Sequence, residues 1–390
     1  RRSSDLRARF RRPPGIYLDG HSLGLLPRAT AKGLAGVVGQ QWGKAAVGGW
    51  NDCGWIDAPA RIGGEIAPLV GAAADEVIAC DSVSVNLFKL VVAALRLRPG
   101  RPVVLVEEGD FPTDAHVAEA AAQLAGGRVR RVPRADILGA LGPDTALLLL
   151  CHAHYRTAEL WDMGALTQAA HAAGALILWD LSHSSGVVEV ELGAADLAVG
   201  CGYKYLSGGP GAPAFAFVAR RHQQALDQPI AGWMGHADPF AFGQNYAPAP
   251  GVRRLLAGTP PILAMAALEE GVKLVAEAGI PAIAAKARAL SDLFIEGVEA
   301  IGDPELLLAS PREGRGGHVL LRHSQAHAVV QALIARGVTG DFRSPDGARF
   351  GFAPLALSFA EVARAARLLG DVLARRLWDQ PAFHVRRTVT

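Results

Sequence analysis

Three apolar runs between residues 103 and 184 constrain the fold of this chain more than any other feature. They read VVLVEE at 103–108, TALLLLCHAH at 145–154 and ALILWDLSHS at 175–184, and each stays apolar until it ends in polar residues. The segments between them, DAHVAEAAAQLAGG and DMGALTQAAHAAG, space their apolar residues as a helix does and end on glycine, a frequent helix stop. Because strands buried on both faces alternate here with helices, the sequence predicts an α/β fold with a mainly parallel central sheet flanked by helices.

The pattern changes after about residue 250, where PPILAMAALEEGVKLVAEAG opens with two prolines, a favoured helix start. Further helical segments follow at 283–302, 327–337 and 359–378, with two short strands at 318–323 and 349–352. We therefore expect three parts: an N-terminal segment over 1–60, a large α/β domain over 61–284 and a smaller C-terminal α+β domain over 285–390.

Composition and charge exclude several classes of function. With 39 basic and 37 acidic residues in 390, the chain has a net charge of +2, which argues against nucleic-acid binding as its main role. The basic run RRSSDLRARFRR is better explained as a solvated tail than as a nucleic-acid arm, and no hydrophobic signal region follows it. The longest apolar runs, such as ALLLLC, are too short to span a membrane.

The cysteines indicate the compartment. There are four, far apart and without a C-x-x-C pair: Cys53, Cys80, Cys151 and Cys201. This spacing favours free thiols in a reducing cytoplasm over a disulfide framework or a zinc site. His152 and His154 share one face of a strand, but no acidic or cysteine ligand stands at a suitable spacing, so we expect no metal site.

Polar side chains follow each predicted strand, where ligands usually bind in parallel sheets. They are Glu107, Glu108, Asp110, His152, His154, Tyr155, Asp180, His183 and Lys204. Together they make the carboxyl edge of the sheet the expected site.

Asp180 and Lys204 suggest a cofactor. Lys204 stands 24 residues after Asp180, at the end of the next apolar stretch. Pyridoxal 5′-phosphate (PLP) needs such a pair, because a lysine amine forms a Schiff base with its aldehyde and a carboxylate pairs with its pyridinium nitrogen. A buried ion pair without any cofactor is equally compatible with this spacing.

Two further segments fit the same cofactor. Ser82 and Ser84 stand just before an apolar helix, whose N-terminus could hold a phosphate, although serine is also an ordinary helix cap. Phe111 follows the strand VVLVEE and could stack on a cofactor ring, or simply pack in the core.

Taken together, these segments resemble kynureninases, PLP enzymes of fold type I in the class V aminotransferase group. The resemblance covers most of the chain and includes YLDGHSLGLLP, GWNDCGWID, DSVSVNLFK, DFPTDAH, HAHYRTAELWDM, WDLSHSSG, GCGYKYLSGGPGAPAF, GWMGH, GTPPIL and RGVTGDFRSPDGARFGFAPL. The blocks WDLSHS, GYKYL and GWMGH are typical of kynureninases rather than of PLP enzymes in general.

The resemblance implies roles around PLP at the matching positions. Lys204 would bear the Schiff base, Asp180 would pair with the pyridine nitrogen, and Phe111 would stack on the ring with Asp114 close by. His183 would lie near the ring hydroxyl, and the phosphate would be held by Val83, Ser84 and Tyr203. Trp233 and Thr259 would reach the phosphate from a neighbouring subunit. This implies a homodimer with shared active sites, to which the segment 1–60 would contribute.

The resemblance also implies a substrate and a reaction. Arg349 would bind the substrate α-carboxylate with a bidentate fork, and His21 and Trp50 would contact the substrate. The family reaction is hydrolytic Cβ–Cγ cleavage of L-kynurenine, or a ring-hydroxylated relative, to an anthranilate and L-alanine. Tyr203 is the expected acid–base group, with a purely structural role at the phosphate as the alternative.

Three departures from the family pattern concern the substrate pocket. His21 replaces the usual asparagine and could titrate, Ala356 replaces a tyrosine, and Gly48 and Gly49 stand where animal enzymes place a histidine. The changes at His21 and Ala356 also leave a PLP-binding protein without activity as an alternative. A cysteine desulfurase or an aminotransferase, which would keep the fold and change the reaction, are further alternatives.

Overall fold

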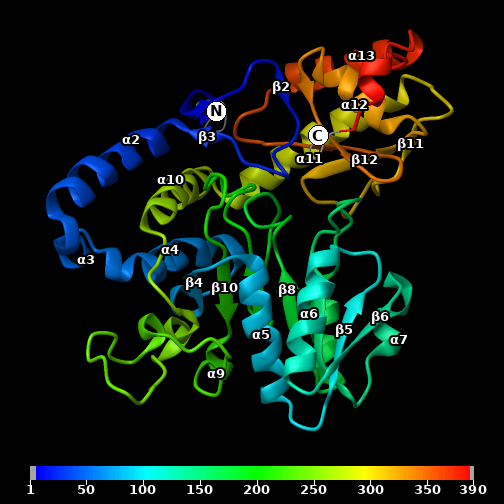
Figure 1. Ribbon diagram of the computed structural model, residues 1–390. Coiled ribbons are helices and arrows are strands. Elements are labelled where there is room, and N and C mark those ends of the chain that lie inside the picture. Colours follow the sequence, from blue (N-terminus) through cyan, green and yellow to red (C-terminus); the bar gives the residue numbers. More distant parts are fainter. Residues whose placement is uncertain (1–5, 387–390) are drawn as a thin grey trace.

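The large sheet has seven strands and forms the centre of the computed structural model, which describes residues 6–386 (Figure 1). Residues 1–5 of the basic N-terminal run lie outside that range. In spatial order the strands are β4 (Val77–Ala79), β10 (Phe215–Val218), β9 (Leu197–Gly200), β8 (Leu176–Asp180), β7 (Thr145–Cys151), β5 (Val103–Glu107) and β6 (Arg128–Val132). Only β10 runs antiparallel to its neighbours in this sheet, so the predicted mainly parallel α/β sheet is confirmed.

Both faces of this sheet are buried, which explains the continuous apolar runs. Along β7, Leu147 and Leu149 belong to one core cluster, whereas Leu148 and Leu150 belong to the other. This alternation follows from the two-residue period of a strand. Helices α5 and α6 cover the first face (Figure 1), and α4, α8 and α10 contribute to the core on the second.

The helices of the described residues have the following bounds: α2 (Arg28–Gly36), α3 (Gly49–Asp52), α4 (Ala58–Ile66), α5 (Val83–Leu97), α6 (Pro112–Leu124), α7 (Ile137–Ala140), α8 (Met163–Ala172), α9 (Arg220–Gln223), α10 (Ile262–Ala278), α11 (Ile280–Glu299), α12 (Ala326–Ile334), α13 (Phe359–Ala374) and α14 (Pro381–His384). Within residues 6–386, none of these helices is long and apolar enough to cross a membrane.

A smaller α+β unit lies above the carboxyl edge of the large sheet in Figure 1. Its four-stranded sheet has the order β11 (Leu307–Leu308), β12 (His318–Arg322), β15 (Gly347–Gly351) and β14 (Asp341–Arg343). Helices α11, α12 and α13 share a separate core cluster with β12 and β15. The N-terminal strand β2 (Ile16–Tyr17) pairs with β13 (Val338–Thr339), so the start of the chain is tied to this unit. The expected boundaries at residues 60 and 284 remain a prediction.

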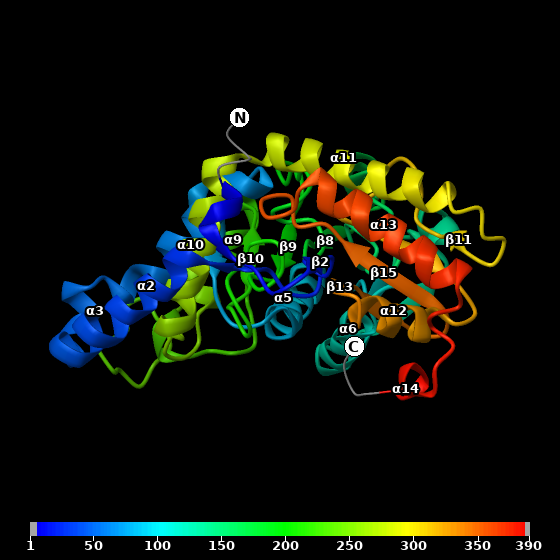
Figure 2. The same cartoon turned by 90° about the horizontal axis from the view of Figure 1, so that it is seen from above.

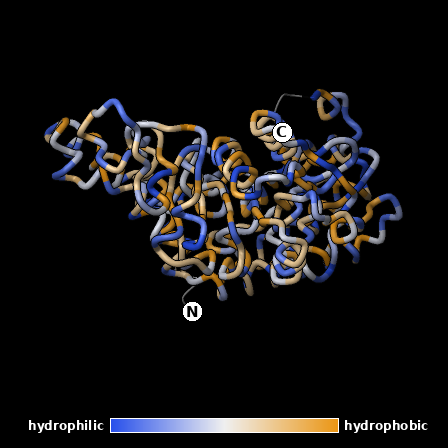
Figure 3. Tube along the Cα trace, turned by 90° about the horizontal axis from the view of Figure 1, so that it is seen from below, coloured by the Kyte–Doolittle hydropathy of each residue, from blue (hydrophilic) through white to orange (hydrophobic). Residues whose placement is uncertain are grey.

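Residues 28–52 form an arm that projects from the body of the molecule (Figure 2). The arm consists of α2, a π-helical stretch over Val37–Ala45 and α3. Seen from below, it carries hydrophobic as well as hydrophilic residues (Figure 3). Among them Val38, Trp42 and Val47 are exposed.

The pairing of β9 with β10 leaves no room for a side chain at Gly200. A Cβ added there would lie 2.4 Å from Cζ of the fully buried Phe215 ring, its partner across the strands. Gly200→Ala should therefore lower the free energy of unfolding by about 1–3 kcal/mol through overpacking. Urea denaturation of the cofactor-free protein measures this loss.

Gly139→Ala in the exposed helix α7 is the control, because no atom lies within 4 Å of an added Cβ there. It should be neutral or stabilising by up to about 1 kcal/mol. Equal stability of the two variants would contradict the packing described for β9 and β10.

Candidate active site

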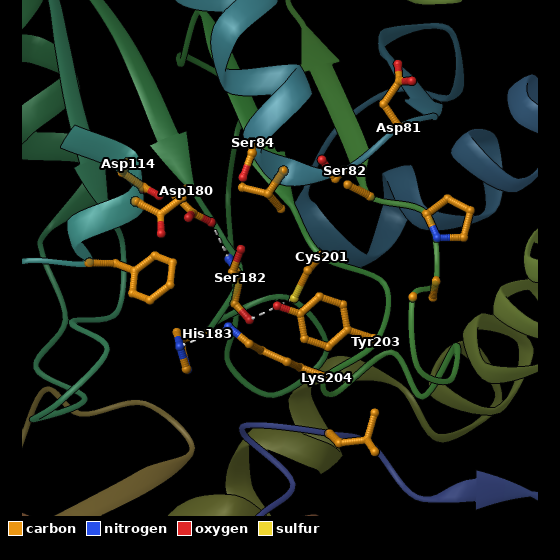
Figure 4. Close-up of a pocket in the computed structure, with 18 of the residues that line it drawn as sticks. Asp81, Ser82, Ser84, Asp114, Asp180, Ser182, His183, Cys201, Tyr203 and Lys204 are labelled. Carbon is orange, nitrogen blue, oxygen red and sulfur yellow. Dashed lines mark hydrogen bonds between the residues drawn. The ribbon is translucent and has the colours of Figure 1, made fainter. Parts of the chain in front are cut away.

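A cavity of about 650 Å³ lies at the carboxyl edge of the large sheet. It brings together eight residues that the sequence proposed for the cofactor: Val83, Ser84, Phe111, Asp114, Asp180, His183, Tyr203 and Lys204. They come from the starts of α5 and α6 and from the ends of β8 and β9, and their side chains converge in Figure 4. The cavity is therefore built where a parallel sheet collects its strand ends.

Lys204 follows β9, and its amine faces His183 within this cavity (Figure 4). Lys204 Nζ lies 3.0 Å from Nε2 of His183. Burial, and then the nearby Lys204 charge, holds the pKa of His183 well below its usual value. The imidazole is therefore neutral, and its Nε2 can accept a hydrogen bond from the lysine.

Asp180 and Asp114 form a buried pair of carboxyl groups on the cavity wall. Asp180 ends β8, and its Oδ1 accepts a 2.7 Å hydrogen bond from the backbone N–H of Ser182. Asp114 lies in the first turn of α6, where its Oδ2 accepts from the Cys151 thiol at 3.4 Å. Burial, followed by the charge of Asp180, raises the pKa of Asp114 well above its usual value. These two effects favour the protonated form of Asp114.

The N-terminus of α5 opens on the same cavity. Ser82 caps the helix, since its side chain accepts from the N–H of Val85 at 3.3 Å, and Val83 and Ser84 are the first two helical residues. Ser82, Val83 and Ser84 all line the cavity. Capping is thus observed for Ser82, while the Ser84 hydroxyl and the first N–H groups of the helix are placed to meet an anion.

Phe111 lies at the mouth of the cavity, just before α6. Its ring is 40% exposed and makes an edge contact with Tyr155 at 5.5 Å between centroids. Its backbone N–H donates to Asp110 Oδ1 at 2.8 Å, and Asp110 Oδ2 accepts from Cys151 N at 3.2 Å. Asp110 therefore ties the turn that carries Phe111 to β7. Burial and the charge of Glu107 raise the pKa of Asp110 to about 7.

Tyr203 precedes the lysine and lines the cavity. Its ring centroid lies 5.7 Å from Lys204 Nζ. Burial, together with the nearby Cys201 and Asp180, raises the pKa of the Tyr203 hydroxyl far above its ordinary value. The phenol is therefore a proton donor at neutral pH.

Arg349 lies in β15 of the smaller unit and is outside the lining of this cavity. It is 1% exposed, and its fork is already filled by Asp341, with Nε–Oδ1 at 2.9 Å and Nη2–Oδ2 at 2.6 Å. The remaining contacts run from Nη1 to the carbonyl of Tyr155 and from Nη2 to Ser22 Oγ at 3.3 Å. The ion pair holds the pKa of Asp341 far below its usual value, although burial opposes this.

His21 is fully buried beside this ion pair. Its ring stacks on His318 at 4.9 Å between centroids, and its Nε2 lies 3.5 Å from Asp341 Oδ1. Burial and the Arg349 charge lower its pKa to about 3. The expectation that His21 titrates is therefore wrong for pH values near neutrality, where the imidazole is neutral.

Like Arg349 and His21, the proposed residues Trp50, Trp233 and Thr259 lie outside the lining of the cavity in their own chain. Trp50 and Trp233 contact each other edge-on at 6.4 Å between centroids. Thr259 is exposed, two residues before Pro261, which does line the cavity.

Comparisons with known proteins identify the family. Residues 283–369 match the kynureninase C-terminal domain family. Kynureninase from Burkholderia mallei (strain SAVP1) is 45% identical over 399 residues, which cover 99% of this chain and 96% of that protein. Kynureninase from Pseudomonas fluorescens is 44% identical over 398 residues, with the same coverage. The chain belongs to the kynureninase family.

Solved structures confirm the fold. The cysteine desulfurase of Thermococcus onnurineus NA1 superposes with a TM-score of 0.79 at 16% identity, covering 93% of this chain and 95% of that one. A C-DES mutant with glycine covalently linked to its PLP cofactor superposes with a TM-score of 0.80 at 16% identity, covering 92% and 96%. The chain therefore has the PLP-dependent fold type I, and it is a PLP-dependent hydrolase.

The cavity fits PLP. It offers an amine at Lys204, a carboxylate at Asp180 and a helix N-terminus for the phosphate. Asp114 Oδ1 and His183 Nδ1 are buried and have no hydrogen-bond partner among the described residues, as expected for groups that face a polar ligand.

Several lining residues escaped the sequence reasoning, among them Asp81, Cys151, Ser182 and Cys201. Cys151 ends β7 and Cys201 follows β9, so their place at strand ends was the signal that could have found them. Asp341, the partner of Arg349, had no signal in the sequence.

The proton on Asp114 gives a testable pH dependence. Because its folded-state pKa is raised, unfolding releases this proton above the unfolded pKa of about 4, and stability falls as the pH rises toward the folded pKa. Asp114→Asn keeps a neutral group there and removes this loss. Relative to the variant, the cofactor-free wild type should lose on the order of 1–3 kcal/mol between pH 5 and pH 8.

Urea denaturation of both proteins at several pH values measures the two slopes. Parallel stability curves for wild type and Asp114→Asn would show that Asp114 is ionised in the folded protein.

Proposed function

We propose that the protein hydrolyses the Cβ–Cγ bond of L-kynurenine, or of a ring-substituted kynurenine, to an anthranilate and L-alanine. The observation that carries this proposal is the convergence of Lys204, Asp180 and Tyr203 in one cavity of a kynureninase-family chain. The relatives that are 44–45% identical to this chain are kynureninases.

PLP, when bound, supplies an electron sink for bonds broken next to the substrate amine. Lys204 would hold the cofactor until the substrate amine replaces it, and its freed Nζ would then take the proton from the substrate Cα. His183 Nε2, 3.0 Å from Nζ, would orient the amine for this transfer. Asp180 would pair with the pyridine nitrogen, and the raised pKa of Asp114 favours a neutral carboxyl group beside it.

Tyr203 is proposed as the acid that assists the addition of water to the γ-ketone and protonates Cβ, which becomes the methyl group of L-alanine, once the Cβ–Cγ bond has broken. Its raised pKa keeps the Oη proton in place for donation. Its position between Lys204 and the α5 side of the cavity supports a second role, in which Oη donates to the phosphate.

Arg349 is proposed to bind the substrate α-carboxylate. Since Asp341 occupies the Nε side of the guanidinium, the carboxylate would approach from the Nη1 side and replace the Tyr155 carbonyl. The neutral His21 would lie beside this contact without adding charge. Trp50 is proposed to contact the aromatic end of the substrate.

A homodimer with shared sites is proposed from the exposed apolar residues of one side of the molecule. They lie on the arm, on the segment after Trp233 and at the start of α10, and comprise Val38, Trp42, Val47, Phe240, Phe242 and Leu263. Trp233 contacts Phe240 and Phe242, so this segment forms one aromatic cluster with Trp50. A partner chain would cover this surface and receive Trp233 and Thr259 at its own phosphate site.

A cysteine desulfurase is the second candidate, because solved structures of that class share the fold. It needs an accessible nucleophilic thiol, yet Cys80, Cys151 and Cys201 are buried, and burial raises the pKa of each. Cys53 is half-buried and lies outside the cavity lining. These thiols favour the hydrolase.

The proposed reaction predicts specific products. Purified protein with PLP should convert L-kynurenine into equal amounts of anthranilate and L-alanine, measured by fluorescence and amino-acid analysis. Lys204→Ala should abolish turnover and the visible absorbance of the lysine-bound cofactor. Tyr203→Phe should retain that absorbance and lose about 10²- to 10⁴-fold in kcat. Sulfur release from L-cysteine without kynurenine turnover would favour the desulfurase instead.

Arg349→Lys tests the carboxylate site. Because an ammonium cannot form two parallel hydrogen bonds, KM for L-kynurenine should rise roughly 10- to 100-fold while PLP affinity stays unchanged. Arg343→Lys is the matched control, since Arg343 bonds the same Asp341 at 2.8 Å but is 39% exposed. A similar rise in KM for both variants would contradict the role of Arg349.

A further inference from the structure

Lys89 is a buried ammonium on α5 that the proposed reaction does not use. Its side chain has no exposed surface. Its three N–H groups are directed at Asp81, at the Leu255 carbonyl (2.6 Å) and at Asn86 Oδ1 (3.4 Å). Asn86 in turn donates to the Cys80 carbonyl at 2.8 Å. Lys89 thus ties the start of α5 to the residues just before it and to Leu255.

Asp81 is the residue that turns the chain from β4 into α5. Its φ of +47° is left-handed, a conformation that aspartate and asparagine tolerate better than most residues. Its carbonyl accepts from Ala214 N at 2.9 Å, so the turn is fixed on both sides. Asp81 lines the cavity next to Ser82 and Val83, yet Figure 4 shows its carboxylate directed away from Lys204 and Tyr203.

The charges explain this orientation. A carboxylate at the mouth of the α5 N-terminus would repel a phosphate dianion bound there, because both are anions in a partly desolvated site. The ion pair with Lys89 neutralises Asp81 and draws its carboxylate toward the helix interior. Burying a lysine is costly unless it is fully paired, and here all three donors have acceptors.

We propose that Lys89 is a positioning residue for the cofactor phosphate. By holding and neutralising Asp81, it leaves the N-terminal N–H groups of α5 and the Ser84 hydroxyl free to bind the dianion. The bond to Leu255 extends the same constraint to the end of the 3₁₀ helix Gly251–Leu255, four residues before Thr259. The inference rests on the proposed place of the phosphate at α5.

Opposite charge changes should then have opposite effects on phosphate affinity. The measured quantity is the PLP preference, defined as the dissociation constant of pyridoxal, which lacks the phosphate, divided by that of PLP. Both constants come from titration of the cofactor-free full-length protein, followed by the visible absorbance of the lysine-bound cofactor. Lys89→Met should lower the preference roughly 10- to 100-fold and leave pyridoxal affinity nearly unchanged.

Asp81→Asn should raise the preference or leave it at the wild-type value, because it removes the repelling charge and asparagine keeps the left-handed turn. The double variant Lys89→Met/Asp81→Asn should return to within a few-fold of wild type, since it contains neither charge. A purely structural role for Lys89 predicts equal weakening of both ligands and no recovery in the double variant, and that result would overturn the proposal.

Two controls separate the possible failures. Leu90→Ala, at a fully buried position of the same helix, should weaken both cofactors equally through packing alone. Ser84→Ala tests the place of the phosphate. If Ser84→Ala lowers the preference and Lys89→Met does not, the phosphate is placed correctly and the role of Lys89 is wrong. If neither variant changes the PLP preference, the phosphate does not bind at the start of α5, and the proposed role of Lys89 is wrong as well.

If Lys89→Met gives no folded protein, the PLP preference of Asp81→Asn tests the proposal instead. A PLP preference at or above the wild-type value supports the proposal, and a lower one contradicts it. If the wild-type protein binds PLP with the expected preference but does not turn over L-kynurenine, the result would count against the proposed reaction and not against the role of Lys89.

Discussion

Charges that meet at the carboxyl edge of the large sheet must be balanced largely out of water. Asp180 ends β8 and Lys204 follows β9, and both lie in one cavity with His183 and Asp114. Two shifted pKa values reduce the number of charges. The lowered pKa of His183 keeps its imidazole neutral beside the lysine, and the raised pKa of Asp114 favours a neutral carboxyl group beside Asp180. One amine and one carboxylate remain, which are the two groups that PLP requires.

The same rule shapes the polar groups around this cavity. Arg349 is buried with Asp341, and the buried Lys89 pairs with Asp81, which is partly exposed. In each pair, one member lies close to the place where a substrate or cofactor anion is proposed to bind, and the other member neutralises its charge. An arginine held by a carboxylate is fixed in place, so an arriving substrate carboxylate meets an oriented guanidinium rather than a mobile one.

The sequence predicted the three longest buried strands of the large sheet, but it missed the shorter buried strands β4 and β10 and the ion pairs between distant residues. The runs at 103–108, 145–154 and 175–184 became β5, β7 and β8, because strands covered on both faces must be apolar throughout. The edge strand β6 was missed, since its sequence RVRRV carries charges of the kind that protect an exposed edge. Asp180 and Lys204 were found by their place at strand ends. The sequence did not identify Asp341 as the partner of Arg349 or Asp81 as the partner of Lys89, because ion pairs between separate elements follow no fixed spacing along the chain.

The attachment of the cofactor to Lys204 is the central claim, and borohydride reduction of the PLP-loaded enzyme tests it most directly. Reduction converts the bond between lysine and cofactor into a stable secondary amine, which peptide mass spectrometry can locate. We expect a phosphopyridoxyl group on the peptide that contains Lys204 and no modification of Lys89. Modification of another lysine, or of none, would contradict it.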